Sequence, residues 1–330
     1  MKTKNKRKLA KEARIILAKK SAEAYKKAKE AVINEKIKCR TVRDAMRYFM
    51  QEWSEISHPG LLSIACEAVG GNPSSSWDIG ASLLLLLSSA HIHDDIIDKT
   101  RIKGGKLTVY GKFDEDIALL VGDAFLFKGL LLLHQACNKL PEEKKEKILE
   151  LTKTAFFEIG CGEVKEVIER RGDTPSVKEC LKYMKMRAKV AEAAMRIGAL
   201  IGNGSEEEIE ALGRYGRILG LLSAIREEFI NVFEPDELRN RYKHEYLPLP
   251  ILYALQNEQK RQQIINVLQK KRITEKDAYA LVDLIMESKE VQRLTRYMHS
   301  LTKKGHVLIS AVKNNRAILE VFIDSTVEDI

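Results

Sequence analysis

Helical periodicity runs along the whole chain and constrains its fold more than any other feature of the sequence. Segments of roughly 15–25 residues carry apolar side chains at three- and four-residue intervals, and no alternating strand pattern of useful length interrupts them. Short breakers such as Ser57–Gly60, Gly70–Pro73 and Gly202–Ser205 separate these segments. No linker rich in proline, glycine or serine divides the chain. The pattern therefore predicts an all-α protein built as a single large helical bundle.

The composition is typical of a soluble globular protein with a sizeable core. Of the 330 residues, 45% are apolar and 31% are charged. The five cysteines are scattered without a CxxC pair, which argues against structural zinc or a disulfide framework and favours a reducing compartment. The leucine run 83–87 is too short, and too soon followed by charge, to span a bilayer. These observations favour a cytoplasmic protein.

The positive charge of the chain is concentrated at its N-terminus. The net charge is +9 overall, whereas residues 1–40 carry 15 Lys/Arg and 4 Asp/Glu, a net +11. Within this arm Leu9, Ala13, Ile16 and Leu17 have helical spacing, which predicts an amphipathic helix. Such a helix could rest on an anionic membrane surface. We favour the alternative, a solvated helix whose apolar face docks on the body. Without aromatic residues among the charges or a recognised module, nucleic-acid binding is not expected.

Two regions follow from this division of charge. A basic helical extension covers residues 1–40, and an all-α domain covers residues 41–330.

Three carboxylates stand directly after the most apolar segment. Asp94, Asp95 and Asp98 have the spacing i, i+1, i+4, so on a helix the first and last stack on one face and the middle one flanks them. Such neighbours repel one another unless a cation neutralises them. Carboxylates without thiolates suit Mg²⁺, which keeps waters and shares oxygens with substrate phosphate. A solvated acidic patch is the alternative, but the five preceding leucines place the acids at the mouth of a buried surface. His91 and His93 are interpreted as packed residues rather than metal ligands.

Basic side chains follow the acids at once. Arg101, Lys103 and Lys106 lie in a segment that contains Gly104 and Gly105. A flexible segment that bears cations beside a metal-binding acid cluster can close over a diphosphate. These three residues are therefore predicted to bind substrate.

Three stretches in order resemble the trans-polyprenyl diphosphate synthase family. His93–Asp98 is similar to the family's first aspartate-rich motif, Gly105–Val109 to its basic loop and Val121–Leu126 to its following Gly-Asp helix. The resemblance covers roughly residues 50–255. It implies the all-helical isoprenoid synthase fold, a central cavity for a prenyl tail and usually a homodimer. It also implies Mg²⁺ ions that bridge two acid motifs and an allylic diphosphate.

The second acid motif departs from the family's DDxxD form. The resemblance places Glu227, Glu228 and Asn231 in its three positions, which keeps the spacing with two carboxylates and one amide. The Phe-Gln pair before it has become Ser223-Ala224. Longer glutamate side chains could still bind Mg²⁺ directly or through water.

Further substrate-binding residues come only from the resemblance. Arg187 follows Met186, which stands in place of a family lysine, so Arg187 could substitute for it. Glu163 stands where the family often has a glutamine near the allylic diphosphate. Arg226 and Lys243 are assigned to the diphosphate as well.

The acceptor side of the pattern is degenerate. The family's GGKRxRP segment, whose cations hold isopentenyl diphosphate, aligns with 53–59, where both cations of the KR pair are missing and His58 replaces the next arginine. Leu87 replaces the histidine that precedes the first motif, and Gly104 one of the two arginines that follow it. A second diphosphate needs cationic donors, so we expect the allylic site to be kept and the isopentenyl diphosphate site to be lost.

Small residues precede the first motif. In the family, bulky residues there limit chain length, whereas Ser88, Ser89 and Ala90 would leave room for a tail of roughly C15–C20 or longer in such a cavity. A close helix–helix seam is the equally weighted alternative.

The sequence supports three functions. The favoured one is a Mg²⁺-dependent prenyltransferase that ionises a long allylic diphosphate in isoprenoid biosynthesis. The second is a terpene synthase that uses a single diphosphate, although only 6% of the residues are aromatic and a cyclase usually steadies cations with aromatic rings. The third is a partner subunit of a heteromeric synthase, which the complete first motif argues against.

Overall fold

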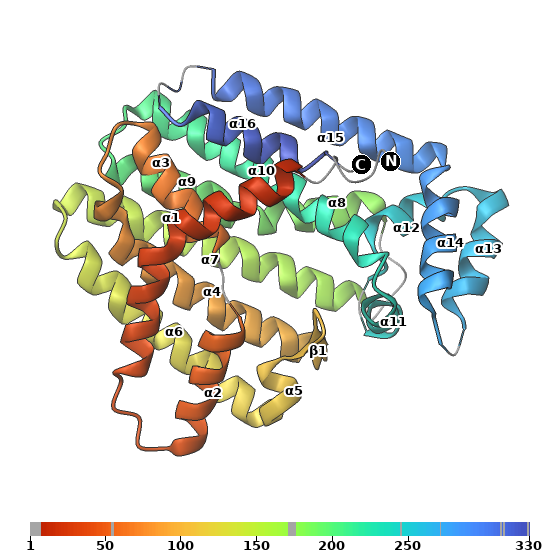
Figure 1. Cartoon of the computed structure of the whole chain (residues 1–330), viewed down its shortest axis with the longest axis horizontal. Coiled ribbons are helices and arrows are strands. Elements are labelled where there is room, and N and C mark those ends of the chain that lie inside the picture. Colours follow the sequence, from red (N-terminus) through yellow and green to blue (C-terminus); the bar gives the residue numbers. More distant parts are fainter. Residues whose placement is uncertain are drawn as a thin grey trace.

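The fold consists of α-helices and one short hairpin (Figure 1). The computed structural model describes residues 8–53, 56–170, 176–244, 246–270, 272–310, 312, 314–328 and 330. The helices are α1 Lys8–Ile33, α2 Arg40–Glu52, α3 Ser57–Ala68, the short 3-10 helix η1 Pro73–Ser76, α4 Trp77–Ile97, α5 Val109–Phe113, α6 Glu115–Cys137, α7 Glu142–Arg170, α8 Val177–Arg187, α9 Lys189–Ile201, α10 Glu206–Asn231, α11 Pro235–His244, α12 Leu249–Ala254, α13 Glu258–Leu268, α14 Glu275–Met286, α15 Lys289–Leu308 and α16 Arg316–Ser325. The predicted all-α bundle is confirmed.

Helices α4 and α9 form the centre of the bundle. Helix α4 packs along α6, and α9 lies between α3 and α10. Both contacts depend on glycines, because a Cβ at Gly129 would meet the Leu86 side chain at 2.8 Å and one at Gly198 would meet the Leu62 carbonyl oxygen at 2.1 Å. Four of the five leucines of the α4 run, residues 83–86, are buried here, which explains its strongly apolar composition. This packing fixes the end of α4, where the aspartates stand.

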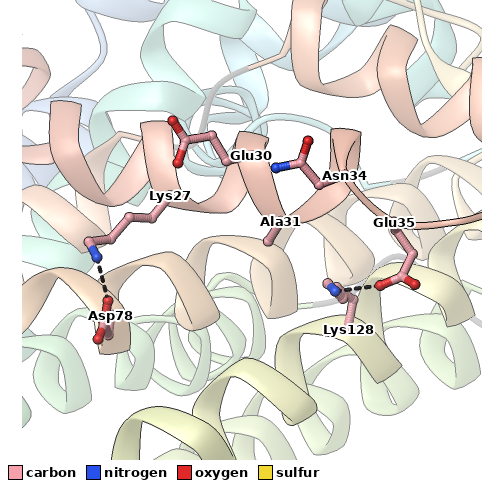
Figure 2. Close-up of a pocket in the computed structure, with 7 residues that line it drawn as sticks. All are labelled: Lys27, Glu30, Ala31, Asn34, Glu35, Asp78 and Lys128. Atoms are coloured by element: carbon pink, nitrogen blue, oxygen red, sulfur yellow. Dashed lines mark hydrogen bonds and ion pairs between the residues drawn. The ribbon is translucent and has the colours of Figure 1, made fainter.

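Helix α1 is docked on the body of the bundle. It packs against α3, α4 and α16, and its apolar face is covered by them, with Ala13 buried and Leu17 against Gly60. Ion pairs connect this region to the body: Figure 2 shows Lys27 of α1 beside Asp78, at 2.8 Å between Nζ and Oδ1, and the pair of Glu35, just after α1, with Lys128. The amphipathic helix expected in the basic arm is therefore present, in the docked arrangement. The division of the chain at residue 40 stays a prediction.

The N-terminus of α1 is capped from the far end of the chain. The backbone N–H groups of Leu9 and Ala10 each donate to the carboxylate of Glu328, both at 3.0 Å. A carboxylate at a helix N-terminus satisfies unpaired donors and opposes the positive end of the helix dipole.

The Gly-containing segment after the aspartates forms a two-stranded antiparallel hairpin. Strand β1, Ile102–Lys103, pairs with β2, Lys106–Leu107. Gly104 and Gly105 connect them with positive φ angles of 55° and 75°, which suit a tight two-residue turn that glycine adopts without strain. The sequence pattern did not predict these strands, because two residues are too few to show an alternation.

Two helices expose a large apolar surface, which we call the α6–α7 face. By length and composition α6 is long and apolar enough to cross a membrane, with a third of that stretch buried within the structure. The exposed apolar residues of the face are Leu119, Leu120, Phe127, Leu130 and Leu131 on α6, and Leu149, Phe156, Phe157, Val164 and Ile168 on α7. Patches of this kind mark interaction surfaces.

Candidate active site

The three aspartates of the first motif lie together where α4 ends. Asp94 and Asp95 are in its last turn, and Asp98 is the C-cap residue, whose N–H donates to the Asp94 carbonyl oxygen at 2.8 Å. Asp95 and Asp98 are buried. Burial raises the pKa of the Asp95 carboxyl to about 7; the cation of Lys103 opposes this rise, and the neighbouring Asp94 and Asp98 add to it. Full ionisation of the three carboxyl groups is therefore unfavourable without a further positive charge.

The cluster also leaves hydrogen-bonding capacity unused. Asp94 Oδ1 is buried and, among the described residues, has no hydrogen-bond partner. The carbonyl end of α4 adds partial negative charge at the same place. The residues therefore fit a cation. No three His, Cys, Asp or Glu side chains in the described part of the chain are grouped so that they could hold a metal ion by themselves.

Lys103 of the hairpin is the basic residue that faces the aspartates. Its Nζ lies 3.9 Å from Asp95 Oδ1. Desolvation opposes the charge of this half-exposed side chain, but the nearby carboxylates, Asp95 first, raise the pKa of Lys103 above its ordinary value. The hairpin thus holds one cation over the acid cluster.

The other two predicted cations of this segment pair elsewhere. Arg101 Nη1 lies 3.8 Å from Asp114 Oδ1, and its guanidinium lies 4.6 Å from the centre of the Tyr110 ring. Lys106 Nζ lies 3.1 Å from Glu52 Oε2. In this arrangement only Lys103 of the three is placed to meet a diphosphate at the aspartates.

The two glutamates of the second motif have different surroundings. Desolvation raises the pKa of Glu227, and the cation of Lys103 opposes this rise, so Lys103 acts on both acid motifs. Glu228 is buried, and its two oxygens accept hydrogen bonds from Arg241 Nη1 at 2.6 Å and from the Leu249 N–H at 2.8 Å. Its carboxylate is thus engaged by the protein, an arrangement that favours a structural role over the predicted metal contact. Asn231 is the last residue of α10.

Helix α11 brings an acid that the sequence analysis missed. Asn240 Nδ2 lies 3.4 Å from the Asp98 carbonyl oxygen, which places this residue of α11 next to the end of α4. Glu237, one turn earlier, raises the pKa of both Asp95 and Lys103 by its negative charge. In the sequence, Asp236-Glu237 after Pro235 has the form of an ordinary acidic helix start, so nothing distinguished Glu237 as a site residue.

Arg187 and Glu163, predicted separately, are bound to each other. Arg187 Nε donates to Glu163 Oε1 at 2.7 Å, and Arg187 Nη2 donates to Glu163 Oε2 at 3.0 Å and to Glu166 Oε2 at 2.6 Å. Burial raises the pKa of Glu163, Arg187 opposes this, and the charge of Asp94 adds to the rise. The pair therefore lies close enough to the first motif for the charge of Asp94 to act on it. Glu166, the second partner of Arg187, was not predicted.

A comparison of the sequence with known protein families gives one match over most of the chain. The profile described as "Polyprenyl synthetase" matches residues 39–285. The chain belongs to the polyprenyl synthetase family.

Individual relatives of this family member agree with the assignment. The chain is 31% identical over 202 residues to geranylgeranyl pyrophosphate synthase 11, chloroplastic, of Arabidopsis thaliana, which covers 59% of this chain and 57% of the relative. It is 30% identical over 200 residues to the heterodimeric geranylgeranyl pyrophosphate synthase large subunit 1, chloroplastic, of the same plant. This match covers 58% of this chain and 54% of the relative. The matches thus span somewhat more than half the length of these relatives.

The fold is also that of a solved family structure. The geranylgeranyl pyrophosphate synthetase of Pyrococcus horikoshii Ot3 superimposes with a TM-score of 0.84 and 21% identity, over 97% of this chain and 99% of that one. This likeness confirms the isoprenoid synthase fold.

The remaining predicted residues have mixed surroundings in this member of the family. Arg226 precedes Glu227 on α10 and lowers the pKa of that neighbour by its charge. The Lys243 side chain lies outside the described part of the structure. His93 packs on α6, where a Cβ at Gly122 would meet its Nε2 at 2.3 Å, in agreement with a packed histidine.

The small residues assigned to the tail pocket lie on the last turns of α4. Ser88 and Ser89 are buried and Ala90 is partly buried. The Ser88 hydroxyl donates to the Leu84 carbonyl oxygen at 2.8 Å, so its polar atom is satisfied within the helix. Their effect on chain length stays a prediction.

Proposed function

We propose that this polyprenyl synthetase family member ionises a long allylic prenyl diphosphate with Mg²⁺ and transfers the prenyl group in isoprenoid biosynthesis. One observation carries the proposal: three aspartates end a buried helix, one of them with a buried oxygen that has no partner in the described part of the chain, and Lys103 faces them. Repelling carboxylates with unused acceptors favour a bound cation, and one lysine cannot neutralise them all.

The residues divide into two roles in this reaction. Asp94, Asp95, Asp98 and Glu227 would hold Mg²⁺, with water and phosphate oxygens completing the coordination. Bound Mg²⁺ would neutralise charge on the departing diphosphate. Lys103 would donate hydrogen bonds to the diphosphate from the hairpin, where its Nζ lies 3.9 Å from Asp95 Oδ1.

A product analysis tests this function. Purified protein is incubated with Mg²⁺ and geranylgeranyl diphosphate, with and without isopentenyl diphosphate. Diphosphate release that depends on Mg²⁺ and is lost in Asp94→Ala, but not in the control Asp283→Ala on the exposed side of α14, supports the proposal. Release that survives in Asp94→Ala would remove the site assignment.

The second candidate function is a terpene synthase, which needs no second diphosphate. The loss of acceptor cations at Ile56 and Met186 supports it, since apolar side chains there cannot hold isopentenyl diphosphate. In the product analysis, a hydrocarbon or alcohol formed without isopentenyl diphosphate would favour this candidate. A longer prenyl diphosphate formed only in its presence would favour chain elongation.

The α6–α7 face supports association with a second copy of the chain. Its exposed apolar side chains lie on two neighbouring helices, as expected of a homodimer interface. Phe127→Glu and Phe157→Glu should shift the protein to a monomer in light scattering, whereas Tyr279→Glu at an exposed position of α14 should not.

The alternative is a heteromer in which this chain serves as a partner subunit, since one named relative is a heterodimer subunit. Activity that appears only when a canonical synthase is added would indicate this heteromer.

We propose a cytoplasmic location with electrostatic contact to a membrane surface through α1. Lys8, Lys11, Arg14 and Lys19 are exposed, whereas the apolar face of the helix is packed on the body. Such contact should pull the protein down with vesicles rich in anionic lipid at low salt and disappear at high salt.

A further inference from the structure

A cavity of about 300 Å³ lies among α1, α3, α9, α10, α16 and the end of α8. Its walls are mainly apolar, with Leu61, Leu219 and Phe322 among them, and the polar groups of His58, Ser223 and Arg187 also line it. We call this cavity the α10 pocket. Its size is at the lower end of the range for small-molecule sites, and mainly apolar walls with a few polar groups are typical of them.

The α10 pocket gathers several of the positions at which the sequence departs from the family's pattern. His58 stands in place of an arginine, Ser223-Ala224 in place of Phe-Gln, and Arg187 beside a lost lysine. These residues come from three segments far apart in the chain, yet all of them line the same cavity. Part of the departure from the family's pattern is therefore concentrated at this one cavity.

The charge of this pocket does not suit a second diphosphate. Of its described lining residues, Arg187 is the one lysine or arginine, and its guanidinium makes three hydrogen bonds to the carboxylates of Glu163 and Glu166. Its single positive charge is thus already faced by two negative ones. A diphosphate carries up to about three negative charges and needs free cationic donors.

The pocket lies next to the proposed prenyl diphosphate site. Arg187 lines the pocket and binds Glu163, and the charge of Asp94 acts on both side chains. The Arg187–Glu163 pair is therefore near both the pocket and the first acid motif. Small side chains, such as Ala191 and Gly220 where α9 meets α10, keep the cavity open.

We propose that the α10 pocket binds an uncharged, largely apolar alcohol as the acceptor of the prenyl group. The apolar walls take the body of the molecule, and the Ser223 hydroxyl that lines them provides a partner for the hydroxyl of the alcohol. This inference rests on the proposed function, because the acceptor role requires that the allylic diphosphate be ionised.

The transfer balances without a further reactant. The C1–O bond of the allylic diphosphate breaks, and its electron pair leaves with the diphosphate. A lone pair on the acceptor hydroxyl oxygen then forms the new C–O bond to C1. The hydroxyl proton passes to the released diphosphate, so the products are an ether and protonated diphosphate, and no oxidation state changes.

Calorimetry with geraniol as probe tests the binding step. The full-length protein is first saturated with Mg²⁺ and geranylgeranyl thiodiphosphate, an unreactive analogue that occupies the allylic site. Geraniol should then bind with one site per chain, and Ser223→Trp and Ala224→Trp, which fill the pocket from α10, should each weaken it at least tenfold. Ser300→Trp, on the exposed face of α15, should leave the affinity unchanged. Circular dichroism melting confirms that each variant is folded.

Four results would decide the inference. Equal geraniol affinity in the wild type and in both pocket variants, or displacement of geraniol by isopentenyl diphosphate, would overturn it. Geranylgeranyl geranyl ether from geranylgeranyl diphosphate and geraniol would support it. Diphosphate release without geraniol binding or ether would overturn this inference and leave the proposed function standing. Lack of release with any acceptor would instead overturn the proposed function and the acceptor role, while binding sensitive to Ser223→Trp would still support the ligand class.

Discussion

The two acid motifs have the same i, i+1, i+4 spacing but opposite surroundings. At the end of α4 the aspartates crowd together, and a buried oxygen of Asp94 has no described partner. At the end of α10 the carboxylate of Glu228 is fully engaged by Arg241 and the Leu249 N–H. Spacing alone therefore does not make a carboxylate a metal ligand. What matters is whether the surrounding protein already satisfies its oxygens.

Among the variants that test this comparison, Asp94→Ala should have the largest effect on the rate of diphosphate release. Asp94→Ala takes away the carboxylate with the unused oxygen, so Mg²⁺-dependent diphosphate release should fall by at least roughly 100-fold, a loss typical of a group that stabilises developing charge. A coupled diphosphate assay measures the rate. An unchanged melting temperature would show that the loss is chemical rather than structural.

The glutamates of the second motif should separate stability from activity. Glu228→Gln leaves Arg241 without its anionic partner in a buried place, and breaking such a pair costs about 3 kcal/mol in the free energy of unfolding. Glu227→Gln should change that free energy by less than about 0.5 kcal/mol, as expected away from such networks, and instead raise the Mg²⁺ concentration needed for half-maximal rate. Urea denaturation and Mg²⁺ titrations measure the two effects. A stable but Mg²⁺-insensitive Glu228→Gln variant would reverse the contrast.

The hairpin lysines provide a smaller test. Lys103→Ala should raise KM for the allylic diphosphate about tenfold, the loss of one charge-assisted hydrogen bond. Lys106→Ala, the matched control on the same hairpin, removes only a pair with Glu52 and should change KM by less than about twofold. Equal effects of the two variants would mean that substrate rearranges the hairpin.

The smallest expected effect concerns metal-free protein. Because the pKa of Asp95 is raised to about 7, its contribution to stability is present below its ordinary pKa and is lost as the pH rises through about 7. In EDTA at pH 8, Asp95→Asn should therefore melt roughly 2–4 °C above the wild type, and the difference should vanish near pH 3. Thermal melts at the two pH values measure it, with Asp283→Asn as the control. An equal difference in melting temperature at both pH values would show that ionisation of Asp95 does not destabilise the metal-free protein.

The sequence predicted the bundle and the first motif because both depend on local patterns. Helical periodicity determines the helices, and the spacing of Asp94, Asp95 and Asp98 alone brings them together at a helix end. The sequence did not show that the Glu228 carboxylate is bound by Arg241, thirteen residues away, and by the backbone N–H of Leu249. Spacing within a motif does not reveal such partners. The same holds for Arg101 and Lys106, whose directions are set by Asp114 and Glu52. In each case, a partner distant in the sequence determines what the side chain contacts.

The cap on α1 has a consequence for the order in which the protein can assemble. Leu9 and Ala10 are bound by Glu328, 319 residues beyond Leu9, and α16 covers part of the same helix. During synthesis α1 therefore leaves the ribosome long before the groups that complete its docking site. The part of α1 that α16 covers therefore stays exposed until α16 has been synthesised, whereas the part under α3 and α4 can be buried early.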